Sequence, residues 1–144
     1  MKTATRHLAL IAAAGMLLSL VGCSEPLVEV KGRVHQNGQP LPVKDSPTAA
    51  GGRVMVLFHS LDPGHEGSGP QGAVVIPDGT WSVPGATGRG IPPGKYRVEV
   101  KWQDPFPMGD DKLEGKFGKA NSPVVVDVPS GEDIDINVAN VTGK

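Results

Sequence analysis

The sequence predicts an all-β protein folded as a single β-sandwich of about seven strands. Glycine and proline contribute 20 and 14 of the 144 residues, and they interrupt the chain too often for helices of more than two turns. Between them lie short runs in which apolar and polar residues alternate with period two, the pattern of strands that bury one face. The number and spacing of these runs favour two packed sheets with Greek-key connections.

The first two strands are expected at 27–34 and 53–59. In "LVEVKGRV" the valines fall on one face and the charged residues fall on the other. Asn37-Gly38 follows, and both residues tolerate the positive φ of a tight turn. The second strand, "RVMVLFH", is apolar on both faces and is therefore expected in the middle of a sheet.

Five further strands complete the sandwich. The segment 72–83, "GAVVIPDGTWSV", predicts two short strands around a turn, with Trp81 packed on the core or capping its end. The last two are "SPVVVDV", from Ser122, and "EDIDINV", from Glu132. The longest strand, 94–102 or "GKYRVEVKW", alternates throughout. Its solvent-facing side chains are expected to be Lys95, Arg97, Glu99 and Lys101.

The first 22 residues have the features of an export signal. Lys2 and Arg6 make a positive start, and "LALIAAAGMLLSLVG", 8–22, then runs without a charge. This run is too short for a membrane-spanning helix, which needs about twenty residues. It matches the apolar region of a secretory signal peptide. Residues 1–22 are therefore expected to be removed on export.

Residues 20–23, "LVGC", resemble the lipobox of bacterial lipoproteins, in which the cysteine is acylated and becomes the first residue of the mature chain. The resemblance implies that Cys23, the only cysteine, carries a lipid anchor that holds the protein to a membrane. A buried or stray thiol would not explain why the apolar run ends here. Residues 23–26 then form the lipidated N-terminus and a short tether, and 27–144 form the domain. By resemblance to enterobacterial sorting, Ser24 favours the outer membrane or cell surface over the inner membrane.

Charge and cysteine content exclude nucleic acid as a partner and a disulfide as a source of stability. The chain has 14 basic and 15 acidic residues, and the loss of Lys2 and Arg6 changes its net charge from −1 to −3. A nucleic-acid-binding protein would instead carry a basic patch or stripe. After lipidation no cysteine is left to pair, so a packed core must stabilise the domain.

Four segments, taken in order, resemble one family. They are "VKGRVHQNGQPLP", "DGTWSV", "IPPGKYRVEVKW" and "SPVVVDVPSGEDIDINV", and with the residues between them they cover nearly all of 27–138. Together they look like the carboxypeptidase regulatory-like domain, a transthyretin-like (prealbumin-like) sandwich, and like small surface lipoproteins of planctomycete-type bacteria. The chain departs from that pattern at "VKDSPTAAGG", which lengthens the first loop. The resemblance implies a mostly non-enzymatic class of stalks, accessory modules and envelope components.

One short segment, "HSLDPGHEG", gathers residues that could bind a divalent metal. Its glycines leave these side chains without a fixed arrangement, so we expect a polar loop and neither a metal nor another cofactor. The candidate ligands are His59, Asp62, His65 and Glu66.

The sequence also lacks the signs of a catalytic nucleophile. There is no G-x-S-x-G motif and no serine with an evident histidine partner. The C-terminal "NVANVTGK" differs from the tyrosine-arginine-glycine-serine tail of the hydroxyisourate hydrolase branch of transthyretin-like folds. We therefore expect no enzymatic activity.

The longest connection, 103–120, is too long for an idle link between strands. It holds Phe106, Met108 and Phe117 among prolines and glycines. These side chains are expected to be exposed and to dock onto a partner protein, or to fold back over an open end of the sandwich.

Two functions from different classes remain open at this level. The first is a lipid-anchored, non-catalytic structural or protein-interaction module of the cell envelope, binding an unknown envelope protein through 103–120 or a sheet face. The alternative is a carbohydrate- or peptidoglycan-binding accessory domain, with Trp81, Trp102 or Tyr96 as a stacking platform. Aromatic residues make up only 4% of the chain, and these three lie at core or turn positions, which favours the first.

Overall fold

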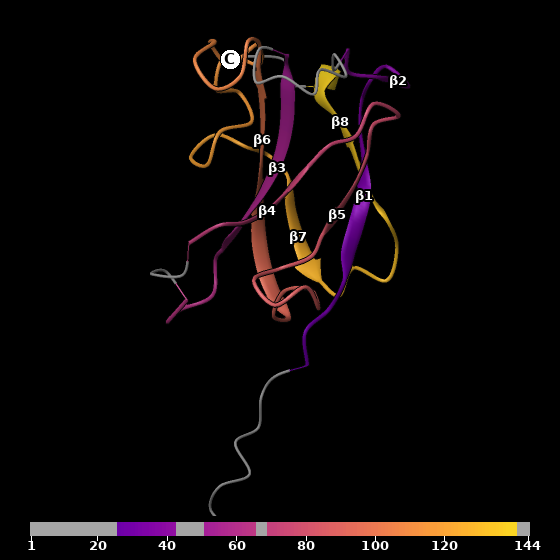
Figure 1. The fold of residues 1–144 in the computed structure, drawn as a ribbon. Coiled ribbons are helices and arrows are strands. Elements are labelled where there is room, and N and C mark those ends of the chain that lie inside the picture. Colours follow the sequence, from indigo (N-terminus) through magenta and orange to yellow (C-terminus); the bar gives the residue numbers. More distant parts are fainter. Residues whose placement is uncertain (1–25, 43–50, 66–68, 141–144) are drawn as a thin grey trace, which may run out of the picture.

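A computed structural model describes residues 26–42, 51–65 and 69–140, which form two β-sheets packed face to face (Figure 1). This confirms the all-β class, and the one helical element among the described residues is a single 3₁₀ turn, Val138–Asn140. No helix in this part of the chain is long and apolar enough to cross a membrane. The strands are β1 (Val30–Gln36), β2 (Gln39–Pro40), β3 (Arg53–Ser60), β4 (Gln71–Val74), β5 (Thr80–Val83), β6 (Gly94–Gln103), β7 (Val125–Val128) and β8 (Ile134–Asn137).

The two sheets differ in how their strands pair. In the first sheet, β1 pairs antiparallel with β2 and β5 and parallel with β8. The second sheet has the order β4-β3-β6-β7 and is antiparallel throughout. Its β3 lies between two neighbours, as its apolar character on both faces predicts.

The core between the sheets is built from alternate side chains of these strands, mostly valines, with an aromatic group at its centre. The ring of Phe58 lies 5.7 Å from that of Trp81 and 5.9 Å from that of Tyr96. Trp81 is thus a core residue. Its ring fits because its partner on β1 is Gly32. A β-carbon there would come within 2.7 Å of the indole and collide with the Ile134 carbonyl.

Two expectations drawn from the pattern need correction, and one alternative is resolved. Glu99 does not face solvent: it is 5% exposed, because neighbouring side chains cover that part of the outer sheet face. The strand expected from Ser122 begins only at Val125, since Ser122 turns its hydroxyl back to the Val98 carbonyl. Phe117 is buried, as the folded-back alternative for 103–120 expects.

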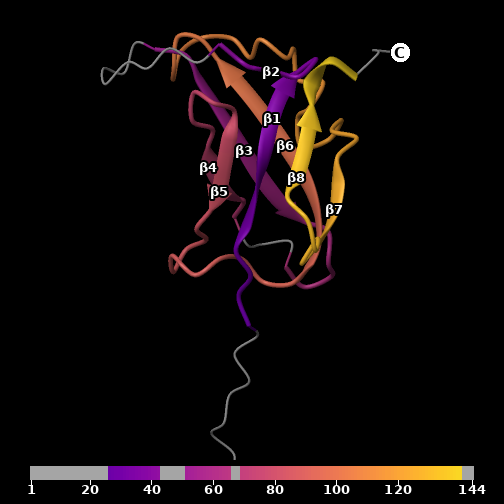
Figure 2. The ribbon, with the colours of Figure 1, turned by 90° about the vertical axis from the view of Figure 1, so that its right-hand side faces the viewer.

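The sandwich has two distinct ends (Figures 1 and 2). The chain enters at residue 26 at one end, here called the proximal end. The strands β1, β6 and β8 all finish at the other, which we call the distal end. The segment 103–120 follows β6 and lies at the distal end, far from the point of entry.

Candidate functional site

A single carboxylate accepts three backbone hydrogen bonds within and beside the distal segment 103–120. Asp111 accepts hydrogen bonds at Oδ1 from the backbone N–H groups of Trp102 and Leu113, at 3.0 and 3.1 Å. Its Oδ2 accepts a third from the Gly115 N–H at 3.0 Å. The Lys112 N–H donates to the Trp102 carbonyl at 2.7 Å. Asp111 therefore satisfies backbone donors that no neighbouring strand reaches.

The second half of this segment belongs to the core. Phe117 is 2% exposed and Leu113 is also buried. The Val100 N–H donates to the Phe117 carbonyl at 3.1 Å, so this part of the loop pairs with β6 where β7 does not reach. Of the two alternatives that the sequence leaves for 103–120, folding back over an open side of the sandwich is the one that describes Phe117.

The first half presents an apolar tip, the residues Phe106 and Met108. Met108 is 91% exposed. Phe106 is half-buried, and the guanidinium carbon of Arg53 lies 4.3 Å from the centroid of its ring. The Gln103 side-chain amide donates to the Pro107 and Gly109 carbonyls at 3.4 and 3.3 Å. The apolar tip thus presents the exposed side chain of Met108, on a loop that the Gln103 amide holds by hydrogen bonds.

The candidate metal ligands are directed to different partners. His59 Nε2 lies 2.6 Å from Glu99 Oε2, on the neighbouring strand. The Asp62 carboxylate accepts the Lys95 N–H at 2.9 Å, and the Asp62 carbonyl accepts the His65 N–H at 3.2 Å. Glu66 lies outside the described residues. Within residues 26–42, 51–65 and 69–140, no three His, Cys, Asp or Glu side chains form a group that could hold a metal.

The pair of His59 and Glu99 is a feature that sequence patterns missed. The two residues are 40 positions apart, and only the antiparallel pairing of β3 with β6 brings them together. Lys101 Nζ lies 3.3 Å from the second oxygen of Glu99, so both carboxylate oxygens are engaged. In the described part of the chain no hydroxyl or thiol is hydrogen-bonded to His59. The cluster is thus a part-buried polar network of His59, Glu99 and Lys101.

Two of the three aromatic residues considered for carbohydrate stacking offer no open platform. Trp81 and Tyr96 are each 4% exposed, and the Tyr96 hydroxyl donates to the Pro92 carbonyl at 2.8 Å. Trp102 is half-buried, with its indole nitrogen enclosed. A stacking surface needs an exposed ring face, which Trp81 and Tyr96 do not present.

Cys23 lies outside the described residues. The described chain begins at Pro26, so only two residues separate Cys23 from it. Comparison with protein-family models, with curated proteins and with solved structures found no match for this chain. Its function is therefore inferred from its own residues and their geometry.

Proposed function

We propose that this protein is a lipid-anchored, non-catalytic interaction module of the bacterial cell envelope, held to the outer membrane or cell surface through Cys23. The observation that carries the proposal is that the segment 103–120, which bears the exposed Met108, lies at the end of the sandwich opposite the point of entry (Figure 1). A lipid on Cys23 would hold the proximal end at the bilayer and direct this segment away from it.

The size of the domain decides which partner the tip can reach. The strand β6 is ten residues long and spans roughly 30 Å. An exposed methionine at its far end is therefore too distant to insert into the membrane that holds the tether. The partner in this proposal is another envelope protein, bound at the apolar tip.

We further propose that the fold is a transthyretin-like Greek-key sandwich of the carboxypeptidase regulatory-like class. Support comes from the strand order, in which the chain repeatedly crosses between the sheets. Strand β1 pairs with β5 and β8, and β3 pairs with β6, so three of the six pairs join strands that are not consecutive in the chain.

Intact mass and membrane fractionation of the full-length protein test the anchor, beside a Cys23→Ala variant. The wild type should lose residues 1–22, gain the mass of acyl chains and sediment with membranes, whereas the variant should gain no acyl mass and should not be cleaved before residue 23. A wild-type protein that is unacylated, or cleaved elsewhere, would remove the anchor from the proposal.

Site-specific photocrosslinking in the producing cell tests the apolar tip. A photoreactive side chain at Met108 should give one discrete protein adduct. The same group at Val125, an exposed apolar position on β7, should give none. Identical adducts from both positions would indicate non-specific contact and contradict a docking role for the tip.

A further inference from the structure

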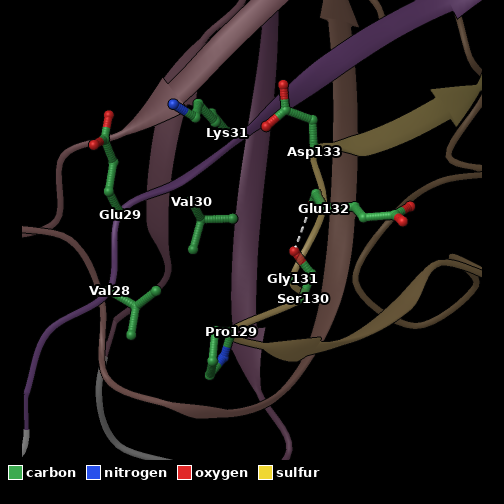
Figure 3. A pocket seen from close by; sticks show the side chains of 9 residues that line it. All are labelled: Val28, Glu29, Val30, Lys31, Pro129, Ser130, Gly131, Glu132 and Asp133. Atoms are coloured by element: carbon green, nitrogen blue, oxygen red, sulfur yellow. Dashed lines mark hydrogen bonds between the residues drawn. The ribbon is translucent and has the colours of Figure 1, made fainter.

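A groove lies toward the proximal end, between the chain that leads into β1 and the turn that joins β7 to β8 (Figure 3). Its volume is about 250 Å³. The side chains of Val28 and Val30 point toward Pro129 and form an apolar floor. We call this feature the proximal groove, and its walls are residues 28–31 and 129–133.

The backbone of the first wall has a free edge. Val28 exchanges two hydrogen bonds with Ile91, at 2.8 and 2.9 Å, and the Val34 N–H donates to the Gly79 carbonyl, at 2.8 Å. These bonds point to the β5 side of β1. Because successive residues of a strand turn their N–H and C=O groups to opposite edges, Glu29 and Lys31 face the other edge, along the groove.

Strand β8 pairs with that other edge only from Gly32 onward, where Gly32 lies opposite Ile134. On the N-terminal side of Gly32, three backbone groups on this edge are not covered by β8: the Glu29 N–H, the Glu29 carbonyl and the Lys31 N–H. None of them has a hydrogen-bond partner among the described residues. A row of unpaired backbone groups beside an apolar floor is the surface to which an extended peptide adds as a strand.

The charge of the walls favours a basic peptide. Two carboxylates, those of Glu29 and Asp133, stand beside the groove with the Lys31 ammonium group, whereas the Glu132 side chain points away from it (Figure 3). In an added strand, alternate side chains would lie on the valine floor while those between them reach the rim. Arginine or lysine at the rim positions would find carboxylates there.

We propose that the proximal groove binds a short extended segment of another protein, with alternating apolar and basic residues, by strand addition to the Glu29–Lys31 edge of the chain. This site is separate from the apolar tip and does not depend on the lipid anchor. The outcome of its test is therefore independent of whether the function proposed above is correct.

The probe is the peptide acetyl-Val-Arg-Val-Lys-Val-amide, titrated into the isotope-labelled full-length protein in detergent. We expect the amide resonances of Glu29 and Lys31 to move most. A matched peptide N-methylated at its central valine and at the lysine that follows, which removes a donor facing the β1 edge in either strand orientation, should bind at least about tenfold more weakly, the effect of one lost hydrogen bond. Equal binding of both peptides, or no binding up to about 1 mM, would overturn the proposal.

Two variants at position 29 distinguish the contribution of the backbone N–H to peptide binding from that of the carboxylate charge. Glu29→Pro removes an edge N–H that has no internal partner, and proline is tolerated at the start of a strand. Glu29→Gln keeps that N–H and removes only the charge. The proline variant should lose about tenfold in affinity and the glutamine variant clearly less. Equal losses would contradict strand addition. If Glu29→Pro does not fold, the comparison of the unmodified and N-methylated peptides on the wild-type protein still tests strand addition.

Discussion

At the scale of single residues, the clearest energetic prediction concerns Glu99. Its carboxylate accepts from the largely buried His59 on one oxygen and faces Lys101 on the other. Glu99→Ala leaves the imidazole buried without its partner, so we expect the free energy of unfolding to fall by about 1–3 kcal/mol. Urea denaturation of the full-length protein in detergent measures this change.

Lys101→Ala is the matched control, because it removes a partner that is itself partly exposed. Its effect should be smaller than that of Glu99→Ala, because solvent that reaches the ammonium group weakens its attraction to the carboxylate. If both variants lost the same stability, the importance assigned to the His59–Glu99 contact would be wrong.

A second prediction at this scale concerns pH and the turn before β5. Hydrogen bonds from the Thr80 hydroxyl, at 2.7 Å, and the Thr80 N–H, at 2.8 Å, lower the pKa of Asp78 below its ordinary value of 3.8. A carboxyl whose pKa is lowered on folding stabilises the protein above its unfolded pKa, and this contribution is lost as pH falls through the folded value.

Asp78→Asn should therefore have a lower urea midpoint than the wild type at about pH 6. The difference between the two midpoints should be smaller at about pH 2.5. The variant keeps a side-chain acceptor for Thr80, so the comparison isolates the charge. A gap that is the same at both pH values would show that ionisation of Asp78 does not contribute.

At the scale of elements, Asp111 is expected to decide whether the distal segment is ordered. Its three backbone hydrogen bonds tie 103–115 to the end of β6. Asp111→Ala should speed hydrogen exchange at the amides of Leu113 and Gly115 by about tenfold or more, since one lost hydrogen bond to a charged group is worth about 1.5–3 kcal/mol. The amides of β1 should be unaffected.

Asp110→Ala provides the control for that experiment. Asp110 is the preceding carboxylate and is exposed, with no hydrogen bond among the described residues. Its removal should leave exchange in the loop unchanged. Faster exchange in both variants would point to a general effect of charge.

At the scale of the whole molecule, the distal loop and the sandwich form one core. Phe117 and Leu113 belong to the same apolar cluster as the valines of β3 and β6. Phe117→Ala should cost about 3–5 kcal/mol and lower the midpoint of a single cooperative transition. Phe106→Ala, which truncates a half-buried ring, should cost much less. A separate early transition of the loop in Phe117→Ala would contradict a shared core.

The sequence alone determined where the strands lie and which side chains enter the core. Its alternation placed Val98, Val100 and Tyr96 inside, and its two-faced apolar run placed β3 in the middle of a sheet. These features are local, because a strand's period of two is set by its own backbone and each side chain is assigned a face by its position.

The tertiary structure alone decided what covers each face. Glu99 is buried because β3 brings His59 to it from 40 positions away, and Phe117 is buried because its loop returns to β6. The free edge at Glu29 exists because β8 begins to pair only at Gly32. Such contacts depend on pairing between segments distant in the chain, and no local pattern of apolar and polar residues encodes that pairing.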